Sequence, residues 1–202
     1  MSAVSSARRR IKRKVAYGLL YLIQYARSLF FKVISTASAE GRPTLHQPMQ
    51  LAGDGNIRFG RNIQIGVFPS PFYLSSYGYF EARSRDAAVQ VGDGTVINNG
   101  FVAIAEHTSI VIGRNVLIGT HVEIYDSDFH GLNRHERSRS NPAWARPVLI
   151  GDDVFLGSNV KVLKGVRIGA GSVIANGSVV VRDIPDNVIA GGIPARVIRE
   201  IP

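Results

Sequence analysis

The side chains best suited to chemistry lie in the stretch YDSDFHG, residues 125–131. His130 carries an imidazole, which titrates near neutral pH and can take a proton from a hydroxyl group. Asp126 and Asp128 precede it closely, and either carboxylate could orient the ring and stabilise its charged form. We therefore predict that His130 acts as a general base, and the spacing leaves open which acid supports it.

The other histidines are weaker candidates for this role. His135 lies in the run RHERSRS, which is typical of a solvated loop, and a solvated loop residue is also the alternative interpretation of His130. His107 and His121 lie inside repeated segments and could face a neighbouring subunit. His46 lies outside the repeat pattern.

A six-residue repeat surrounds this stretch and must position it. Aliphatic anchors recur at every sixth residue from position 150, and a second set of small or β-branched residues follows each anchor by four. Helices repeat at 3.6 residues and strands at two, so a period of six predicts a solenoid built from short strands. The anchors, expected to point into a narrow interior, are Ile150, Leu156, Val162, Ile168, Ile174 and Val180.

The repeat also precedes the histidine stretch, in shorter runs. Further anchors are Leu51, Ile57, Ile63, Val91, Ile97, Ile112, Ile118 and Ile124. Two segments depart from the period, at about 67–88 and 126–148. We predict that both are insertions, and that rigid coils on either side of the second hold His130 in place.

Composition limits the kinds of protein this can be. The chain has 202 residues, 45% of them hydrophobic, and no cysteine, which excludes disulfides, cysteine-bound zinc and a thiol nucleophile. The net charge is +9, but residues 1–39 contain eight Lys and Arg and no acid, so residues 40–202 carry only +1 (9 − 8). The basicity belongs to the N-terminal arm, and we expect no nucleic-acid partner.

The N-terminal arm, residues 1–40, reads as a basic amphipathic helix. Apolar residues recur at steps of three and four, and a tyrosine-rich stripe lies beside them. The longest apolar run is too short to span a bilayer. We predict peripheral contact with an anionic membrane through residues 8–36. The alternative is that the helix packs on a protein surface. Polar residues inside the apolar run argue against a cleaved leader.

The ending VIGDDVFLGSNVKVLKGVRIGAGSVIANGSVVVRDIPDNVIAGGIPARVIREI resembles that of the hexapeptide-repeat acyltransferases, in particular the sugar O-acetyltransferase branch. The resemblance covers roughly residues 50–202 and implies an all-β solenoid, a left-handed parallel β-helix, over 41–202. It further implies acetyl-CoA as acyl donor without a metal, a sugar or glycan acceptor, and a cytoplasmic homotrimer with sites between subunits. A cell-surface polysaccharide or its lipid-linked precursor is the expected acceptor, at the inner face of the membrane.

The same resemblance assigns binding residues. Ser158 is implied beside the CoA arm, and Arg182 and Arg196 near its phosphates. Asn176 replaces a usual small residue on the nucleotide side. Asn98 and Asn99 match a position that touches the sugar in relatives, although an asparagine at a solenoid corner has an equally good structural explanation.

Four other functions fit parts of this pattern. An N-acetyltransferase of amino sugars or a serine acetyltransferase would share the same ending. A γ-type carbonic anhydrase would need a third upstream histidine near residues 94–99, which GTVINN lacks. A non-catalytic solenoid scaffold would bind no acetyl-CoA.

Overall fold

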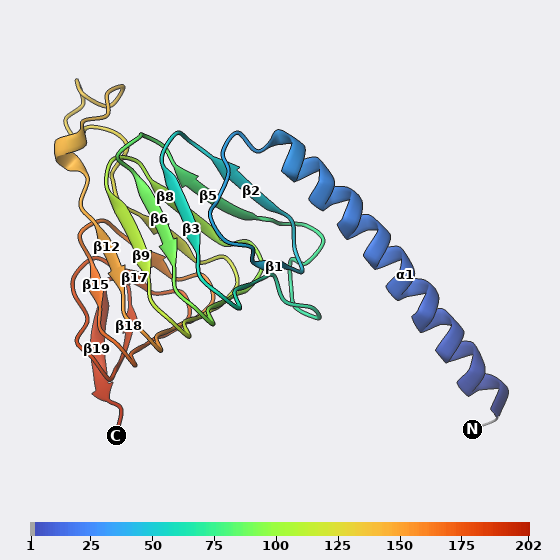
Figure 1. Cartoon of the computed structure of the whole chain (residues 1–202). Coiled ribbons are helices and arrows are strands. Elements are labelled where there is room, and N and C mark those ends of the chain that lie inside the picture. Colours follow the sequence, from blue (N-terminus) through green and yellow to red (C-terminus); the bar gives the residue numbers. More distant parts are fainter. Residues whose placement is uncertain (1–2) are drawn as a thin grey trace.

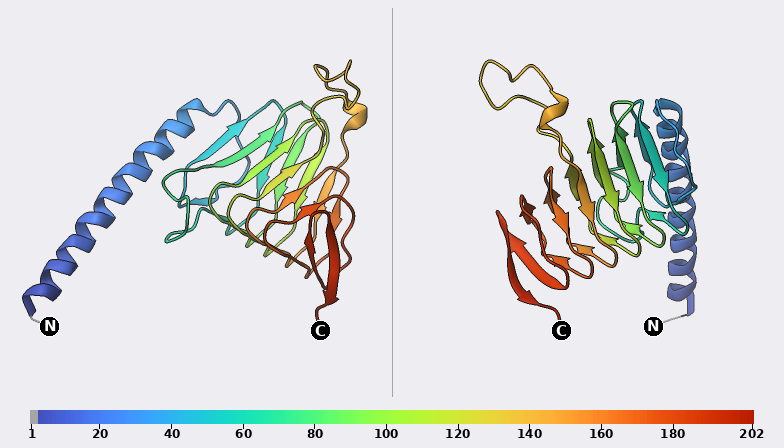
Figure 2. Two further views of the ribbon diagram at one scale, coloured as in Figure 1. Left: turned by 180° about the vertical axis from the view of Figure 1, so that it is seen from behind. Right: turned by 60° about the vertical axis from the view of Figure 1, so that its left-hand side comes forward.

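The computed structural model describes residues 3–202, with side chains from residue 8 onward; in that part of the chain one long helix precedes a stack of short-stranded coils (Figure 1). The helix, α1 (Ala3–Ile34), lies at the first coil, and the C-terminal strands close the opposite end of the stack (Figure 2). This confirms the predicted architecture of an N-terminal helix followed by a solenoid.

The first five coils each contribute one strand to each of three sheets, and pairing is parallel until the last two strands, which are antiparallel. Sheet I contains β1 (Thr44–Leu45), β4 (Gln64–Ile65), β7 (Val96–Ile97), β10 (Leu117–Ile118), β13 (Phe155–Leu156), β16 (Val173–Ile174), β18 (Val188–Gly192) and β19 (Ala195–Glu200). Sheet II contains β2 (Met49–Ala52), β5 (Gly78–Ala82), β8 (Val102–Ala105), β11 (Glu123–Tyr125), β14 (Lys161–Val162) and β17 (Val179–Val180). Sheet III contains β3 (Asn56–Phe59), β6 (Ala88–Val91), β9 (Ser109–Ile112), β12 (Val148–Ile150) and β15 (Arg167–Ile168).

The six-residue period arises because a two-residue strand and a four-residue corner make one side of a coil. All six anchors from Ile150 to Val180 are buried, and so are the six residues that follow them by four. Aliphatic side chains thus fill a prism between the three sheets, where their removal from water stabilises the stack. The fold is the predicted left-handed parallel β-helix.

Two segments leave the coils, and we call them the first and second excursions. The first spans residues 66–77 and is shorter than predicted, because residues 78–82 and 88–91 form the regular strands β5 and β6. The second spans residues 126–147 and contains a short 3₁₀ helix, η1 (Pro142–Trp144). It lies between β11 and β12, at the corner where sheet II passes to sheet III.

Candidate active site

Asp126 anchors the start of the second excursion. Its side chain is fully buried, and its two oxygens accept hydrogen bonds from the backbone N–H groups of Glu106 (2.7 Å), His107 (3.2 Å) and Thr108 (2.8 Å). Its own carbonyl accepts from Arg146 N–H at 2.8 Å, which brings the two ends of the excursion together. Both carboxylate oxygens are therefore committed to the coil below, and not to His130.

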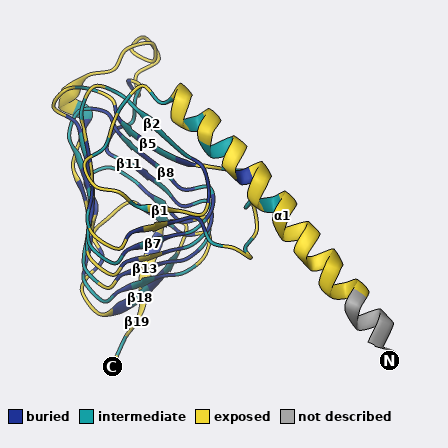
Figure 3. Ribbon diagram, turned by 45° about the vertical axis from the view of Figure 1, so that its right-hand side comes forward, coloured by how far each residue is buried: buried dark blue, intermediate teal, exposed yellow. Residues whose placement is uncertain are grey.

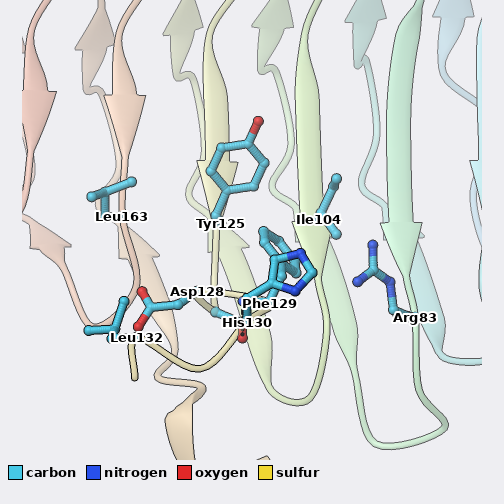
Figure 4. Close-up of a pocket in the computed structure, with 9 residues that line it drawn as sticks. Arg83, Ile104, Tyr125, Asp128, Phe129, His130, Leu132 and Leu163 are labelled. Carbon is cyan, nitrogen blue, oxygen red and sulfur yellow. Dashed lines mark hydrogen bonds between the residues drawn. The ribbon is translucent and has the colours of Figure 1, made fainter. Parts of the chain in front are cut away.

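His130 lies at the mouth of a pocket of about 630 Å³ on the outer face of sheet II. The imidazole is exposed and points to the same side of the strands as Arg83 and Tyr125 (Figure 4). Ile104, Leu132 and Leu163 add apolar walls. An exposed imidazole beside a partly apolar hollow can meet a bound hydroxyl group and take its proton.

Phe129, immediately before His130, is held on both sides. Its ring lies 5.0 Å from the Arg83 guanidinium and meets the edge of Tyr125 with 5.6 Å between centroids. Its backbone has φ of +61°, a region that a residue with a β-carbon enters only at an energetic cost. These contacts fix the ring of the residue that directly precedes His130.

The two residues that clamp Phe129 are themselves fixed by carboxylates. Arg83 pairs with Glu81 at 2.7 Å and Glu106 at 3.2 Å, and the hydrogen bond to Glu81 raises the pKa of Arg83. The Tyr125 hydroxyl donates to Glu123 at 2.8 Å; burial, together with that bond, raises the pKa of Tyr125. Both side chains therefore keep their protons near neutral pH and offer a fixed wall.

Asp128 is paired with Lys164, at 2.5 Å, and not with His130. Lys164 also donates to the carbonyl of Trp144 at 2.8 Å, so it connects the start and end of the second excursion. The predicted pairing of His130 with an acid therefore has no counterpart among the hydrogen bonds of the described residues.

Four of the residues assigned to acceptor and donor binding, Asn98, Asn99, Ser158 and Asn176, lie at a different corner. Following the register of sheet I, Asn99, Ser158 and Asn176 occupy equivalent places just after β7, β13 and β16, where sheet I passes to sheet II. Ser158 N–H donates to Asn176 Oδ1 at 2.8 Å. Asn98, half-buried, is the neighbour of Asn99 at this corner.

Asn99 has a structural task in this chain. It is fully buried, and its amide group donates to the carbonyls of Val67 (3.0 Å) and Pro71 (2.9 Å) and accepts from Val67 N–H (3.1 Å). These three bonds hold the first excursion. Of the two explanations for this asparagine, the structure supports the structural one.

The two arginines assigned to CoA phosphates are both exposed. Arg182 follows β17 at the corner of sheets II and III, the corner from which the second excursion leaves. Arg196 lies on β19, at the C-terminal end of the stack. The structure thus brings Arg182 to the same edge as His130, and leaves Ser158 and Asn176 at the other edge of sheet II.

The remaining histidines have other neighbours. His121 stacks on Phe72, with 4.0 Å between ring centroids, and His107 lies 3.3 Å from the Ser140 hydroxyl. His135 is exposed, and its ring accepts from Arg134 at 3.0 Å. Within the described residues, His, Asp and Glu side chains form no group of three or more that could hold a metal ion.

Several residues around His130 were not predicted from the sequence: Arg83 lines the sheet II pocket, and Lys164 lines a second hollow beside His130. Arg83 and Lys164 lie 47 and 34 residues from His130 along the chain, and each follows a strand of sheet II by a residue or two. Parallel coils place those corners one above another, so an alignment of the repeats coil by coil would have found both.

Comparison with known proteins adds to this picture. The family described as bacterial transferase hexapeptide (six repeats) matches residues 147–182. An Escherichia coli protein, provisionally named a lipopolysaccharide biosynthesis O-acetyl transferase, is 31% identical over 198 residues, covering 94% of this chain and 93% of its own. Escherichia coli galactoside O-acetyltransferase is 39% identical over 123 residues, but the match covers 61% of this chain and only 58% of that enzyme.

Solved structures agree with the sequence comparison. A polysialic-acid-specific acetyltransferase superposes with a TM-score of 0.61 at 28% identity, covering 78% of this chain and 71% of that one. A Vibrio cholerae hexapeptide-repeat acetyltransferase, solved with acetyl-CoA, superposes with a TM-score of 0.51 at 26% identity, covering 100% and 93%. Full-length similarity, the repeats and the coiled fold lead to one conclusion: this chain belongs to the hexapeptide-repeat transferases, within their acetyltransferases.

Proposed function

We propose that this protein moves an acetyl group from acetyl-CoA to a hydroxyl group of a sugar or glycan, with His130 as the general base. The observation that carries the proposal is the exposed imidazole that lines the sheet II pocket, on a chain similar over nearly its whole length to a protein provisionally named an O-acetyl transferase. An acetyl-CoA complex of a structural neighbour supports the donor.

The reaction needs one base and no resident cofactor. His130 takes the acceptor hydroxyl proton as the oxygen attacks the thioester carbonyl carbon; the new C–O bond forms and the C–S bond breaks. The leaving thiolate of CoA recovers the proton from the imidazolium. Backbone N–H groups at the corners are available to stabilise the tetrahedral oxyanion.

The assembled enzyme is a homotrimer in this proposal. The outer face of sheet I carries an aligned apolar column, in which Leu117 and Phe155 are 50% and 44% exposed. Its members in register are Val96, Leu117, Phe155, Val173 and Ile189. An exposed apolar ladder of this kind suits a subunit interface. Within one chain, His130 and the corner that holds Ser158 and Asn176 lie at opposite edges of sheet II. In the proposed trimer, a neighbouring copy supplies the His130 that faces this corner.

Acetyl-CoA consumption with mass analysis of the product tests the proposed reaction. The panel comprises neutral sugars, acidic sugars, nucleotide sugars and lipid-linked glycans. His130→Ala should reduce turnover about 10²–10⁴-fold. His135→Ala, five residues further along the same exposed segment, serves as the matched control and should retain activity. A loss below tenfold for His130→Ala would reject the assignment of the base.

A mixing experiment tests the shared site. Coexpressed His130→Ala and Ser158→Trp chains should regain activity if a site takes His130 from one copy and the Ser158 corner from another. A mass corresponding to three chains, together with that recovery, is the expected result. Mixed assemblies without activity would place the whole site within one chain.

A further inference from the structure

The helix α1 contacts its own domain through two polar side chains, Gln24 and Arg27, and through the rings of Phe31 and Tyr17, whose centroids lie 4.3 Å from Tyr77 and 6.0 Å from Phe68. Gln24 is 6% exposed, and its amide donates to the carbonyls of Tyr73 (2.9 Å) and His46 (3.3 Å). The Arg27 guanidinium donates to the carbonyl of Ser76 at 2.7 Å. Amphipathic surface helices ordinarily pack their apolar stripe on the core, whereas the apolar stripe of α1 is not the face that contacts the domain.

The apolar stripe of α1 faces away from the domain. Val15 and Val33 lie nine residues on either side of Gln24, which is about two and a half helical turns and so the opposite side of the helix. Figure 3 shows the helix exposed along almost its whole length, apart from a few positions at the domain. Side chains of the stripe are more than half exposed: Ile11 63%, Val15 56%, Leu19 55%, Leu22 65%, Phe30 58% and Val33 75%.

The charges on α1 narrow the choice of partner. Arg8, Arg9, Arg10, Lys12, Arg13 and Lys14 are all exposed, and the helix contains no acidic residue. Tyr21 and Tyr25, which flank the stripe, are 83% and 70% exposed. In the part of the chain that the structure describes, no helix has the length and apolar character to cross a bilayer. Cations, tyrosines and an apolar stripe on one such helix match the interface of an anionic membrane.

We propose that α1 lies in the headgroup region of an anionic membrane, with the Ile11–Val33 stripe turned into the lipid and the β-helix held on the aqueous side. The hydrogen bonds of Gln24 and Arg27 to the domain then fix the angle between the membrane and the coils. A second copy packed in parallel on the stripe would be a less suitable occupant, because it would bring two clusters of basic residues together without a counter-charge. This inference does not depend on the acetyl-transfer reaction.

Vesicle flotation of the full chain tests the proposal. Liposomes of phosphatidylcholine alone are compared with liposomes containing about one third phosphatidylglycerol, at low and high salt. We expect binding to the anionic vesicles and weaker binding at high salt, because screening shortens the reach of the surface charge. Replacing Arg8, Arg9 and Arg10 by Gln should lower partitioning roughly 10²-fold, at about 1 kcal/mol for each cation.

A second variant separates the apolar contribution from the charge. Leu19→Gln/Leu22→Gln removes two exposed leucines from the stripe without adding charge, and should also release the protein. The matched control is Val197→Gln/Ile198→Gln, which removes two exposed apolar residues from β19 (48% and 64% exposed) and should bind as the wild type does. A thermal melt confirms that each variant is folded.

Three outcomes would overturn the proposal. One is a wild-type chain that does not float with anionic vesicles. Another is Leu19→Gln/Leu22→Gln binding as tightly as the control. The third is a change of oligomeric state in that variant without vesicle binding by the wild type, which would assign the stripe to a second copy of the chain.

Discussion

The two excursions leave the same rigid stack, yet they are held in different ways. The first, residues 66–77, is fastened by the amides of Gln24, Gln47 and Asn99, all buried, which bond to its backbone carbonyls. Gly66 at its start has φ of +87°, and a β-carbon there would collide with Gln47. The second, residues 126–147, is fastened at its two ends and by one further contact, between Ser140 Oγ and His107 Nε2 at 3.3 Å; residues 132–143 are exposed.

This difference indicates how the solenoid divides its tasks. A segment fastened through several of its backbone carbonyls contributes to the frame and to the contact with α1. A segment fastened mainly at its base can place side chains over the pocket while most of its length remains open to a large acceptor. The substitutions below test that division, in order of expected effect.

Asp126→Ala should be the most damaging change to the frame. It leaves the N–H groups of Glu106, His107 and Thr108 without their acceptor in a buried corner. We expect a loss of about 3–5 kcal/mol in the free energy of unfolding, measured by urea denaturation. Asp126→Asn, which keeps one acceptor oxygen, should lie between Ala and the wild type. A stable Asp126→Ala protein that has lost only activity would instead restore the predicted pairing with His130.

Asn99→Ala should weaken the first excursion by a smaller amount. Three hydrogen bonds to Val67 and Pro71 would be lost, and the expected cost is about 2–3 kcal/mol in unfolding free energy. Asn98→Ala, at the same corner, loses only the hydrogen bond that Asn98 Oδ1 accepts from Asn99 N–H at 2.8 Å; it is the matched control and should cost about 1 kcal/mol or less. A raised KM for the acceptor in Asn99→Ala, with unchanged stability, would favour the sugar contact that the resemblance implied.

Phe129 tests whether a clamped ring positions the base. Phe129→Ala and Phe129→Gly both remove the ring, but only Gly adopts the φ of +61° without strain. If the contacts to Arg83 and Tyr125 position His130, both variants should lower kcat by roughly tenfold, with little change in KM. Full activity in Phe129→Gly, with loss in Phe129→Ala, would show that the backbone conformation alone matters.

Much of the frame could be predicted from the sequence because the six-residue period directly reports burial. Each anchor occupies an interior place, so the positions of Ile150 to Val180 follow from counting alone. The period also located the second excursion to within a residue. It placed the end of the first excursion too late, because Tyr79 and Glu81 face outward in β5 and obscure the repeat.

The site was harder to predict because its contacts join distant coils. His130 was identified as a candidate by its type, but the partners of the two acids depend on which corners are stacked. Asp126 bonds to residues 106–108, one coil below, and Asp128 to Lys164, one coil above. The closeness of the two acids to His130 in the sequence suggested that one of them pairs with it. In the solenoid, both carboxylates instead bond to groups on the neighbouring coils.

The ion pair between Asp128 and Lys164 should contribute least. The two side chains are 33% and 27% exposed, and solvent screens such a pair, so Lys164→Met should cost about 1 kcal/mol or less in unfolding free energy. Asp128→Asn should cost no more, and the loss should shrink further at high salt because screening already weakens the pair. If Lys164→Met instead cost more than about 3 kcal/mol, its bonds to Asp128 and Trp144 would fasten the second excursion as firmly as the buried amides fasten the first. The contrast between a fixed frame and an open site segment would then be wrong.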